Sequence, residues 1–210
     1  MTFLEILVEG SSDVPVVREI LTRRFGRTEF EHFRIHAHQG KGSRPAHPNR
    51  EPDQKHRGLL DHLPARLRAY AGMSRTQDVG VVVLLDADDE DCRELKSYLL
   101  SLEPRPAKFL FRIAVEEVES WFLADRAAVR QSFSRAKVSR IPRGPADQVI
   151  GAWECLARVL DEDPSKITGQ RKTRWAERIA PQLNLETPGS PSLHAFIAGV
   201  ERMLANTIDA

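Results

Sequence analysis

The sequence predicts an α/β fold, with a mostly parallel four-stranded sheet flanked by helices and a C-terminal helical extension. Two observations support this prediction. Four short apolar runs alternate with segments of helical periodicity up to about residue 125, and the pattern after Trp121 is helical throughout. Strands that alternate with helices usually form a largely parallel sheet with right-handed crossovers.

The elements of the sheet follow one another in a regular order. We expect strands at residues 2–8, 30–36, 79–85 and 108–115, because each run is apolar or alternates with a period of two. One helix begins after the turn at Gly10 and ends at Gly26, and further helices cover residues 56–73 and 90–102. Residues 38–54 contain five Gly or Pro residues, which predicts a long polar loop, and loops of this length are usually functional or mobile.

The C-terminal part has no strand-like run in its sequence. Pro and Gly residues separate four segments of helical periodicity, at about 126–134, 146–160, 172–183 and 192–206. The last segment carries a continuous apolar stripe, which predicts that it packs against a core. We therefore expect an α/β domain over residues 1–125 and a helical extension over residues 126–210 that packs on it.

The composition is that of an ordinary globular protein. The 210 residues are 41% hydrophobic and 29% charged, which is long and apolar enough for one well-packed core. Two cysteines, Cys92 and Cys155, are too few for a disulfide framework or a zinc site, and the histidine spacing fits no compact zinc motif. Because no apolar run resembles a signal peptide or approaches membrane-spanning length, we expect a cytoplasmic protein with no membrane partner.

Charge is distributed unevenly although the net charge is only +1. Residues 34–75 contain nine Lys or Arg and five His, and residues 126–146 contain six basic residues and no acid. Residues 86–94 instead contain six acids and one arginine. An acidic centre between basic segments suits a metal site that receives a polyanion. The alternative, that these segments are simply solvated surfaces, stays open for each of them.

Acidic residues follow three of the four predicted strands. We name these groups the first, second and third acidic segments: Glu9 with Asp13, Asp86 with Asp88, and Glu116 with Glu117 and Glu119. The carboxyl ends of parallel strands meet at one edge of the sheet, where ligands usually bind. Hard cations such as Mg²⁺ prefer carboxylate oxygens. The sequence therefore predicts a Mg²⁺ or Mn²⁺ site at this edge.

The three acidic segments differ in how well the sequence defines them. Asp86 and Asp88 are two residues apart at a strand end and should point the same way, whereas Asp89, Glu90 and Asp91 suit the cap of the next helix. In the third segment two registers stay open. Glu116 and Glu119 share a face if a helix begins at Val115, but Glu117 is at the strand tip if the strand continues to it. We favour Glu117 at the tip with Glu119 behind it.

The first two acidic segments resemble the Toprim domain of topoisomerases, bacterial primases and overcoming-lysogenisation-defect nucleases. Glu9-Gly10 matches the single glutamate of that family, Asp86-Ala87-Asp88 matches its DxD pair, and Asp13 matches an extra acid of the nuclease branch. The stretch around Glu116–Phe122, with Lys172–Ala176 and Ser190–Ser192, is similar to a small bacterial family catalogued as domain of unknown function family 4276. The resemblance implies a Toprim-like sheet that binds divalent metal.

This resemblance and the acidic segments together favour metal-dependent hydrolysis of phosphodiester bonds in DNA or RNA. Glu9, Asp86 and Asp88 would hold one ion, and Asp13 with Glu117 or Glu119 would help to hold a second. Lys41, or a C-terminal Lys or Arg, would neutralise developing charge. The residues expected to contact nucleic acid are Lys41, Arg44, Arg50, Lys172 and Arg174.

The resemblance also bears on partners. The nuclease branch often joins an ATPase to the Toprim domain, and this chain has no Walker motif, so an ATP-driven step, as in phage or mobile-element defence, would need a separate ATPase subunit. Tyr70 and Tyr98 lie in predicted helices without a recognisable motif, which argues against a topoisomerase-type covalent step. The alternative function is a Mg²⁺-binding subunit that senses nucleic acid or nucleotide without cutting it. The sequence leaves the oligomeric state open, including a homo-oligomer.

Overall fold

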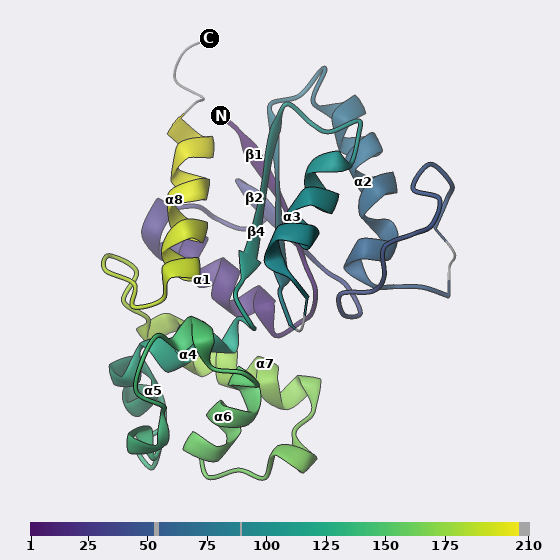
Figure 1. Cartoon of the computed structure of the whole chain (residues 1–210). Helices are drawn as coiled ribbons and strands as arrows, with labels where there is room; N and C mark the ends of the chain where they lie inside the picture. Colours follow the sequence, from purple (N-terminus) through teal and green to yellow (C-terminus); the bar gives the residue numbers. More distant parts are fainter. Residues whose placement is uncertain (53–54, 89, 206–210) are drawn as a thin grey trace.

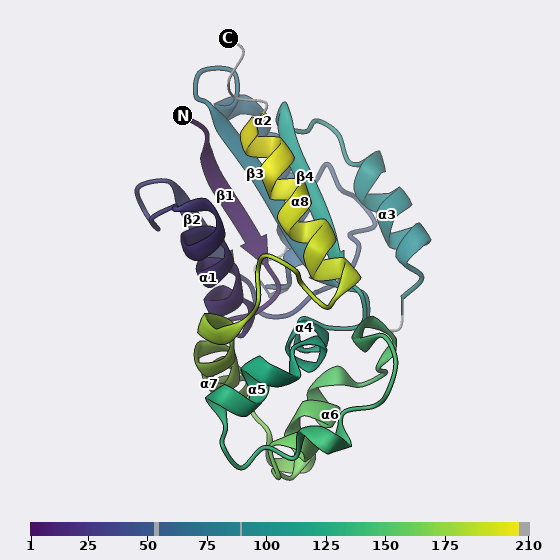
Figure 2. The same cartoon turned by 90° about the vertical axis from the view of Figure 1, so that its left-hand side faces the viewer.

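A computed structural model describes residues 1–52, 55–88 and 90–205. Its centre is a four-stranded sheet of order β2-β1-β3-β4 in which every neighbouring pair is parallel. The strands are β1 (Phe3–Val8), β2 (Phe33–Ala37), β3 (Val79–Asp86) and β4 (Lys108–Ala114). This architecture, shown in Figures 1 and 2, confirms the predicted fold class.

Helices cover both faces of the sheet. On one face α2 (Leu59–Met73) and α3 (Cys92–Ser101) pack against alternate residues of β3, including Val81 and Val83. On the other face α1 (Asp13–Phe25) and α8 (Pro191–Ala205) pack against the intervening residues, such as Val82 and Leu84. Burial on both faces explains why β3 reads as a continuous apolar run.

The remaining helices form a group beyond the carboxyl ends of the strands (Figure 2). They are α4 (Glu119–Ala124), α5 (Arg126–Ser132), α6 (Ala152–Val159) and α7 (Gly169–Ile179), with short 3₁₀ turns at Val138–Arg140, Ala146–Gln148, Pro164–Lys166 and Ala180–Gln182. Their buried side chains belong to the same hydrophobic cluster as α1 and α8. The chain then returns along the sheet as α8, which packs against β4.

A buried polar network ties this helical group to α8. The indole Nε1 of Trp121 donates to Ser192 Oγ at 2.8 Å. Asp147 accepts from Ser190 Oγ at 2.6 Å and from the backbone N of Ser192 at 2.8 Å. Because each buried polar group in this network has a partner, it fixes where α8 begins without an unpaired charge in the core.

Several predicted boundaries were wrong for local reasons. The second strand begins at Phe33 rather than residue 30, because Phe30 has a left-handed backbone with φ of 67°. The expected helix 146–160 is a 3₁₀ turn followed by α6, since Gly151, with φ of 64°, interrupts it. The helix expected at 172–183 starts earlier, at Gly169, where the Thr168 side chain caps it. Within the described residues no helix combines the length and apolar character needed to cross a membrane.

Candidate functional site

The first acidic segment lies directly after β1. Glu9 reaches across to β3, where its Oε1 accepts a hydrogen bond from the backbone N of Asp86 at 2.8 Å. Asp13 is the first residue of α1 and is only 6% exposed. Its Oδ2 accepts from the backbone N of Gly10 at 2.9 Å, which closes the turn between strand and helix. Both carboxylates therefore lie at the carboxyl edge of the sheet.

In the second acidic segment the two acids lie at different depths. Asp86 is the last residue of β3, and its Oδ1 accepts from the backbone N of Val118 at 3.2 Å. Asp88 follows with a left-handed backbone, φ 49°, and its side chain is 48% exposed. We expected both side chains to point the same way because residues two apart in a strand do so. The strand ends at Asp86, so this geometry does not extend to Asp88.

The third acidic segment adopts neither of the two registers expected from the sequence. β4 ends at Ala114, Glu116 turns the chain with φ of 65°, and α4 begins at Glu119. Glu117 is therefore not at a strand tip, and the register that we favoured was wrong. Glu119 is 5% exposed and lies among the acids of the other segments, whereas Glu117 Oε2 accepts from the backbone N of Trp153 at 2.9 Å.

We call the carboxylates that meet at this edge the acidic cluster: Glu9, Asp13, Asp86, Asp88 and Glu119. Burial, together with repulsion from Asp88 and Asp13, raises the pKa of Glu9 from 4.5 to about 8. Burial, with repulsion from Glu119, raises the pKa of Asp13 from 3.8 to about 6. The pKa of Asp86 is raised well above its usual value, first by burial and then by its acidic neighbours. The arrangement thus concentrates negative charge in a poorly solvated place.

Two lysines border the acidic cluster. Lys41 Nζ donates to the carbonyl of Ala87 at 2.9 Å and to Asp88 Oδ2 at 3.2 Å. Lys172 Nζ lies 3.2 Å from Glu119 Oε1, and its side chain is 24% exposed. Burial opposes the charge of Lys172, but the carboxylates of Glu119 and Glu117 outweigh it and raise its pKa. Lys172 therefore stays charged, and each lysine occupies a position next to a carboxylate of the acidic cluster.

The donors of the acidic cluster fit a divalent ion in chemical type. Carboxylate oxygens are the ligands of Mg²⁺ and Mn²⁺. In the part of the chain that the structure describes, however, no three His, Cys, Asp or Glu side chains already form a group able to hold an ion. The oxygens are instead engaged by backbone N–H groups and by the two lysines. Side-chain rotation would be needed to gather them around an ion.

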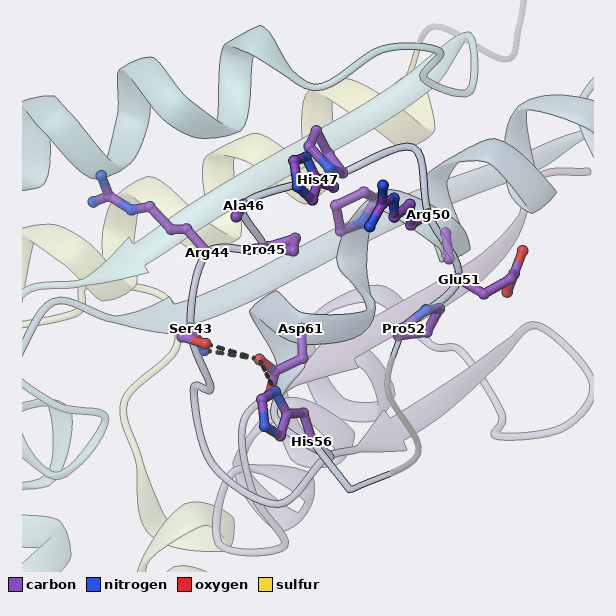
Figure 3. A pocket seen from close by; sticks show the side chains of 13 residues that line it. Ser43, Arg44, Pro45, Ala46, His47, Arg50, Glu51, Pro52, His56 and Asp61 are labelled. Atoms are coloured by element: carbon purple, nitrogen blue, oxygen red, sulfur yellow. Dashed lines mark hydrogen bonds and ion pairs between the residues drawn. The ribbon is translucent and has the colours of Figure 1, made fainter.

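The other predicted contacts are dispersed. Arg44 bonds to Glu90 Oε2 at 3.0 Å beside Lys41, and it also lines a hollow of the loop together with Arg50, His47 and Asp61. Figure 3 shows this hollow, where the backbone N and Oγ of Ser43 both donate to Asp61 Oδ1 at 3.1 Å. The structure thus brings Lys41 into contact with the acidic cluster, and Arg44 links Glu90 beside Lys41 to the hollow that Arg50 lines.

The C-terminal basic residues also separate. Arg174 lines a hollow with Lys166 and Arg171, whereas Lys172 faces the acidic cluster. Residues 172 and 174 differ by about 200° around a helix, so they cannot share a face. Asp91 caps α3 as expected, and Asp89 lies outside the described residues.

Sequence reasoning missed Trp153. Its ring lies beside the acidic cluster, with Lys172 Nζ 5.3 Å from the ring centroid. Its backbone N holds Glu117, 36 residues earlier in the chain. Nothing in the spacing of the sequence indicated this contact, because it depends on how α6 packs against α4.

The parallel sheet and the acids at its carboxyl edge define an α/β protein of Toprim-like fold. The chain belongs to the family described as Domain of unknown function (DUF4276), whose model matches residues 8–201, as the sequence predicted. No curated protein matches the chain.

Several solved structures are similar to this one, among them the C-terminal regions of two OLD proteins. The C-terminal region of the Burkholderia pseudomallei OLD protein has a TM-score of 0.50 and 13% identity, with 97% of each chain covered. The C-terminal region of the Xanthomonas campestris pv. campestris OLD protein has a TM-score of 0.46 and 13% identity, with 99% of this chain and 98% of that chain covered. At this level of identity the similarity concerns the fold.

Proposed function

We propose that this protein is a Mg²⁺- or Mn²⁺-dependent nuclease that hydrolyses phosphodiester bonds in DNA or RNA. The observation that carries the proposal is the buried acidic cluster at the carboxyl edge of a parallel sheet, bordered by two lysines. Acids whose pKa values are raised by burial and by one another are typical of functional sites. The Toprim-like fold supports the same reaction class by analogy.

Each residue of the cluster has a role in this proposal. Glu9, Asp86 and Asp88 would hold one divalent ion, and Asp13 with Glu119 would help to hold the second. Glu117 is the alternative ligand to Glu119, at the cost of its bond to α6. Bound divalent ions supply Lewis-acid stabilisation of the oxygens that attack and leave phosphorus.

In this proposal the two lysines bind phosphate groups of the substrate. In this proposal Lys41 and Lys172 exchange their carboxylate partners, Asp88 and Glu119, for phosphate oxygens when nucleic acid binds. An ammonium held at that position stabilises the extra negative charge of the transition state. Arg44, which shares Glu90 with Lys41, extends positive charge along the flanking backbone.

One observation favours the second candidate, a Mg²⁺-binding subunit that recognises nucleic acid without cutting it, beside a separate ATPase. The described residues hold no group of three potential ligands ready for an ion, and lysines neutralise two of the acids. A site of this kind needs a rearrangement before catalysis, and a partner protein can supply it.

Cleavage by the purified protein tests the proposal. We expect wild-type protein to cut single-stranded or plasmid DNA, or RNA, with Mn²⁺. Asp86→Asn should lose at least about 100-fold in rate, a typical loss when charge stabilisation is removed from a catalytic site. It should also lose Mn²⁺ binding in calorimetric titration.

The matched control is Asp163→Asn, which changes an exposed acid that caps a 3₁₀ turn far from the cluster along the chain. It should cut and bind Mn²⁺ like wild type. Wild-type cleavage by Asp86→Asn would contradict the proposed site. Mn²⁺ binding without cleavage of any substrate would favour the non-cleaving candidate.

A further inference from the structure

Beside the acidic cluster, the ring of Trp153 borders the position of Lys172, and an exposed apolar residue lies close to Trp153 in the sequence. Trp153 is partly exposed, and Lys172 Nζ lies 5.3 Å from the centroid of its ring. The same Nζ lies 3.2 Å from Glu119 Oε1. A cation that we assign to phosphate binding is therefore shared between the acidic cluster and the face of an indole.

Ile150 lies three residues before Trp153 and is 84% exposed. It directly precedes Gly151, the N-cap of α6. An apolar residue at this position commonly packs back onto the first turns of the helix and so leaves water. Ile150 does not, although Val149 beside it packs against the core. The apolar side chain of Ile150 is therefore available for contact with a ligand.

We infer that Trp153 and Ile150 form a subsite for an unpaired nucleobase next to the phosphate that Lys172 receives. The inference rests on the proposed function, because it takes Lys172 as a phosphate contact. A nucleotide carries a charged phosphate and a flat base side by side, which matches a cation beside an aromatic face. Proteins that bind single strands combine positive charge with aromatic stacking in this way.

When nucleic acid binds, Lys172 exchanges its contact with the Trp153 ring for a contact with a phosphate. In the free protein Lys172 covers the Trp153 ring through a cation–π contact. When Lys172 turns to a phosphate, the ring face becomes available to a base, and Ile150 contributes apolar contact at its edge. Bases in a duplex are already stacked on their neighbours, so the subsite selects single-stranded or unpaired nucleic acid.

Tryptophan fluorescence measures this contact without cleavage. Trp121 and Trp175 are each only 1% exposed, so an oligonucleotide can stack only on Trp153 among the tryptophans. Titration of the full chain in EDTA with a twelve-residue oligothymidine should quench the emission, and an abasic phosphodiester chain of equal length should not. The quenching should be absent in Trp153→Phe, which keeps an aromatic ring.

Affinity gives a second readout. Ile150→Ser changes an exposed residue and should weaken oligothymidine binding by about tenfold, within the range measured when one side chain that stacks on a base is removed. Its affinity for the abasic chain should be unchanged. Leu100→Ser is the matched control, since Leu100 is 48% exposed at the far end of α3 and should bind like wild type.

The outcomes separate this inference from the proposed function. Equal affinity of wild type for the abasic chain and oligothymidine, or quenching that persists in Trp153→Phe, would overturn the subsite even if the protein cuts DNA. Quenching that requires Trp153, in a protein that never cuts with Mn²⁺, would support the subsite and contradict the nuclease.

Discussion

Replacing Asp13 with asparagine should stabilise the metal-free protein at neutral pH. Asp13 is 6% exposed, and its pKa is raised from 3.8 to about 6 by burial and by the neighbouring Glu119, against the bond from Gly10 N and the charge of Lys172. Asparagine has nearly the same shape and keeps an oxygen that accepts from the Gly10 N–H. The substitution therefore removes a disfavoured charge and leaves the turn before α1 intact.

The size of the effect follows from the pKa. The difference between 3.8 and about 6 corresponds to about 3 kcal/mol of unfolding free energy once both states are ionised. This figure is an upper limit, because the amide accepts a weaker hydrogen bond than the carboxylate, a loss of about 1 kcal/mol. We expect a gain of about 1–2 kcal/mol, or roughly 2–8 °C in melting temperature for a chain of this size.

The direction of the pKa shift determines how the stability gain of Asp13→Asn changes with pH. Because the pKa of Asp13 is raised on folding, its contribution to stability is complete below about 3.8 and is lost as the pH rises through about 6. The gain in Asp13→Asn should therefore be small at pH 4, grow up to pH 6 and stay constant above it. Asp163→Asn is a control for which the opposite change in stability is expected. Hydrogen bonds from Ser165 lower the pKa of Asp163, so this variant should lose stability at neutral pH.

Urea unfolding in EDTA, followed by circular dichroism between pH 4 and pH 8, measures both variants. Excess Mn²⁺ should reverse the order, because an ion bound only to the folded state stabilises wild type more than Asp13→Asn. A variant that is less stable than wild type at pH 7.5 in EDTA, or a gain that is equally large at pH 4, would refute the reasoning.

Two further predictions concern the third acidic segment and the basic residues of the loop at residues 38–54. Glu119→Gln should reduce Mn²⁺-dependent cleavage more than Glu117→Gln, because Glu119 faces Asp13 and Asp86 whereas Glu117 holds α6; full activity in both variants would exclude the segment from catalysis. Replacing Lys41, Arg44 and Arg50 together with glutamine should weaken nucleic-acid binding and flatten the slope of log affinity against log salt by about 0.9 for each phosphate that the protein no longer neutralises. An unchanged slope would mean that the loop is only a solvated surface.

The sheet was predictable because its signal is local. β3 buries every residue from Val79 to Leu85, and a strand buried on both faces must be apolar throughout. The alternation of such runs with amphipathic helices then leaves few possible topologies. Strand order and register were not in the sequence pattern, since they depend on pairings such as Ile6 with Val82 that join distant segments.

The candidate site was predictable in position but not in orientation. Acids that follow parallel strands must lie at one edge, which is why Glu9 and Asp86 were found from the sequence. Asp88 and Glu116 both have left-handed backbones, which residues other than glycine rarely adopt and which no pattern announces. Those two residues redirect the chain, so side-chain directions derived from an ideal strand or helix failed there.

Two carboxylates outside the acidic cluster form ion pairs that are typical of acids that stabilise a fold. Asp78 bonds to Lys108, and Glu162 bonds to Arg171, and in each case the basic partner lowers the pKa of the carboxyl.

Three carboxylates of the acidic cluster show pKa shifts in the opposite direction. The pKa values of Glu9, Asp13 and Asp86 are raised even though Lys41 and Lys172 lie at its border. Ionising these acids therefore opposes folding at neutral pH, because burial is the largest cause of the raised pKa values. An arrangement that lowers stability is expected where the charge serves binding or catalysis, which is the physical reason to place function at this edge of the sheet.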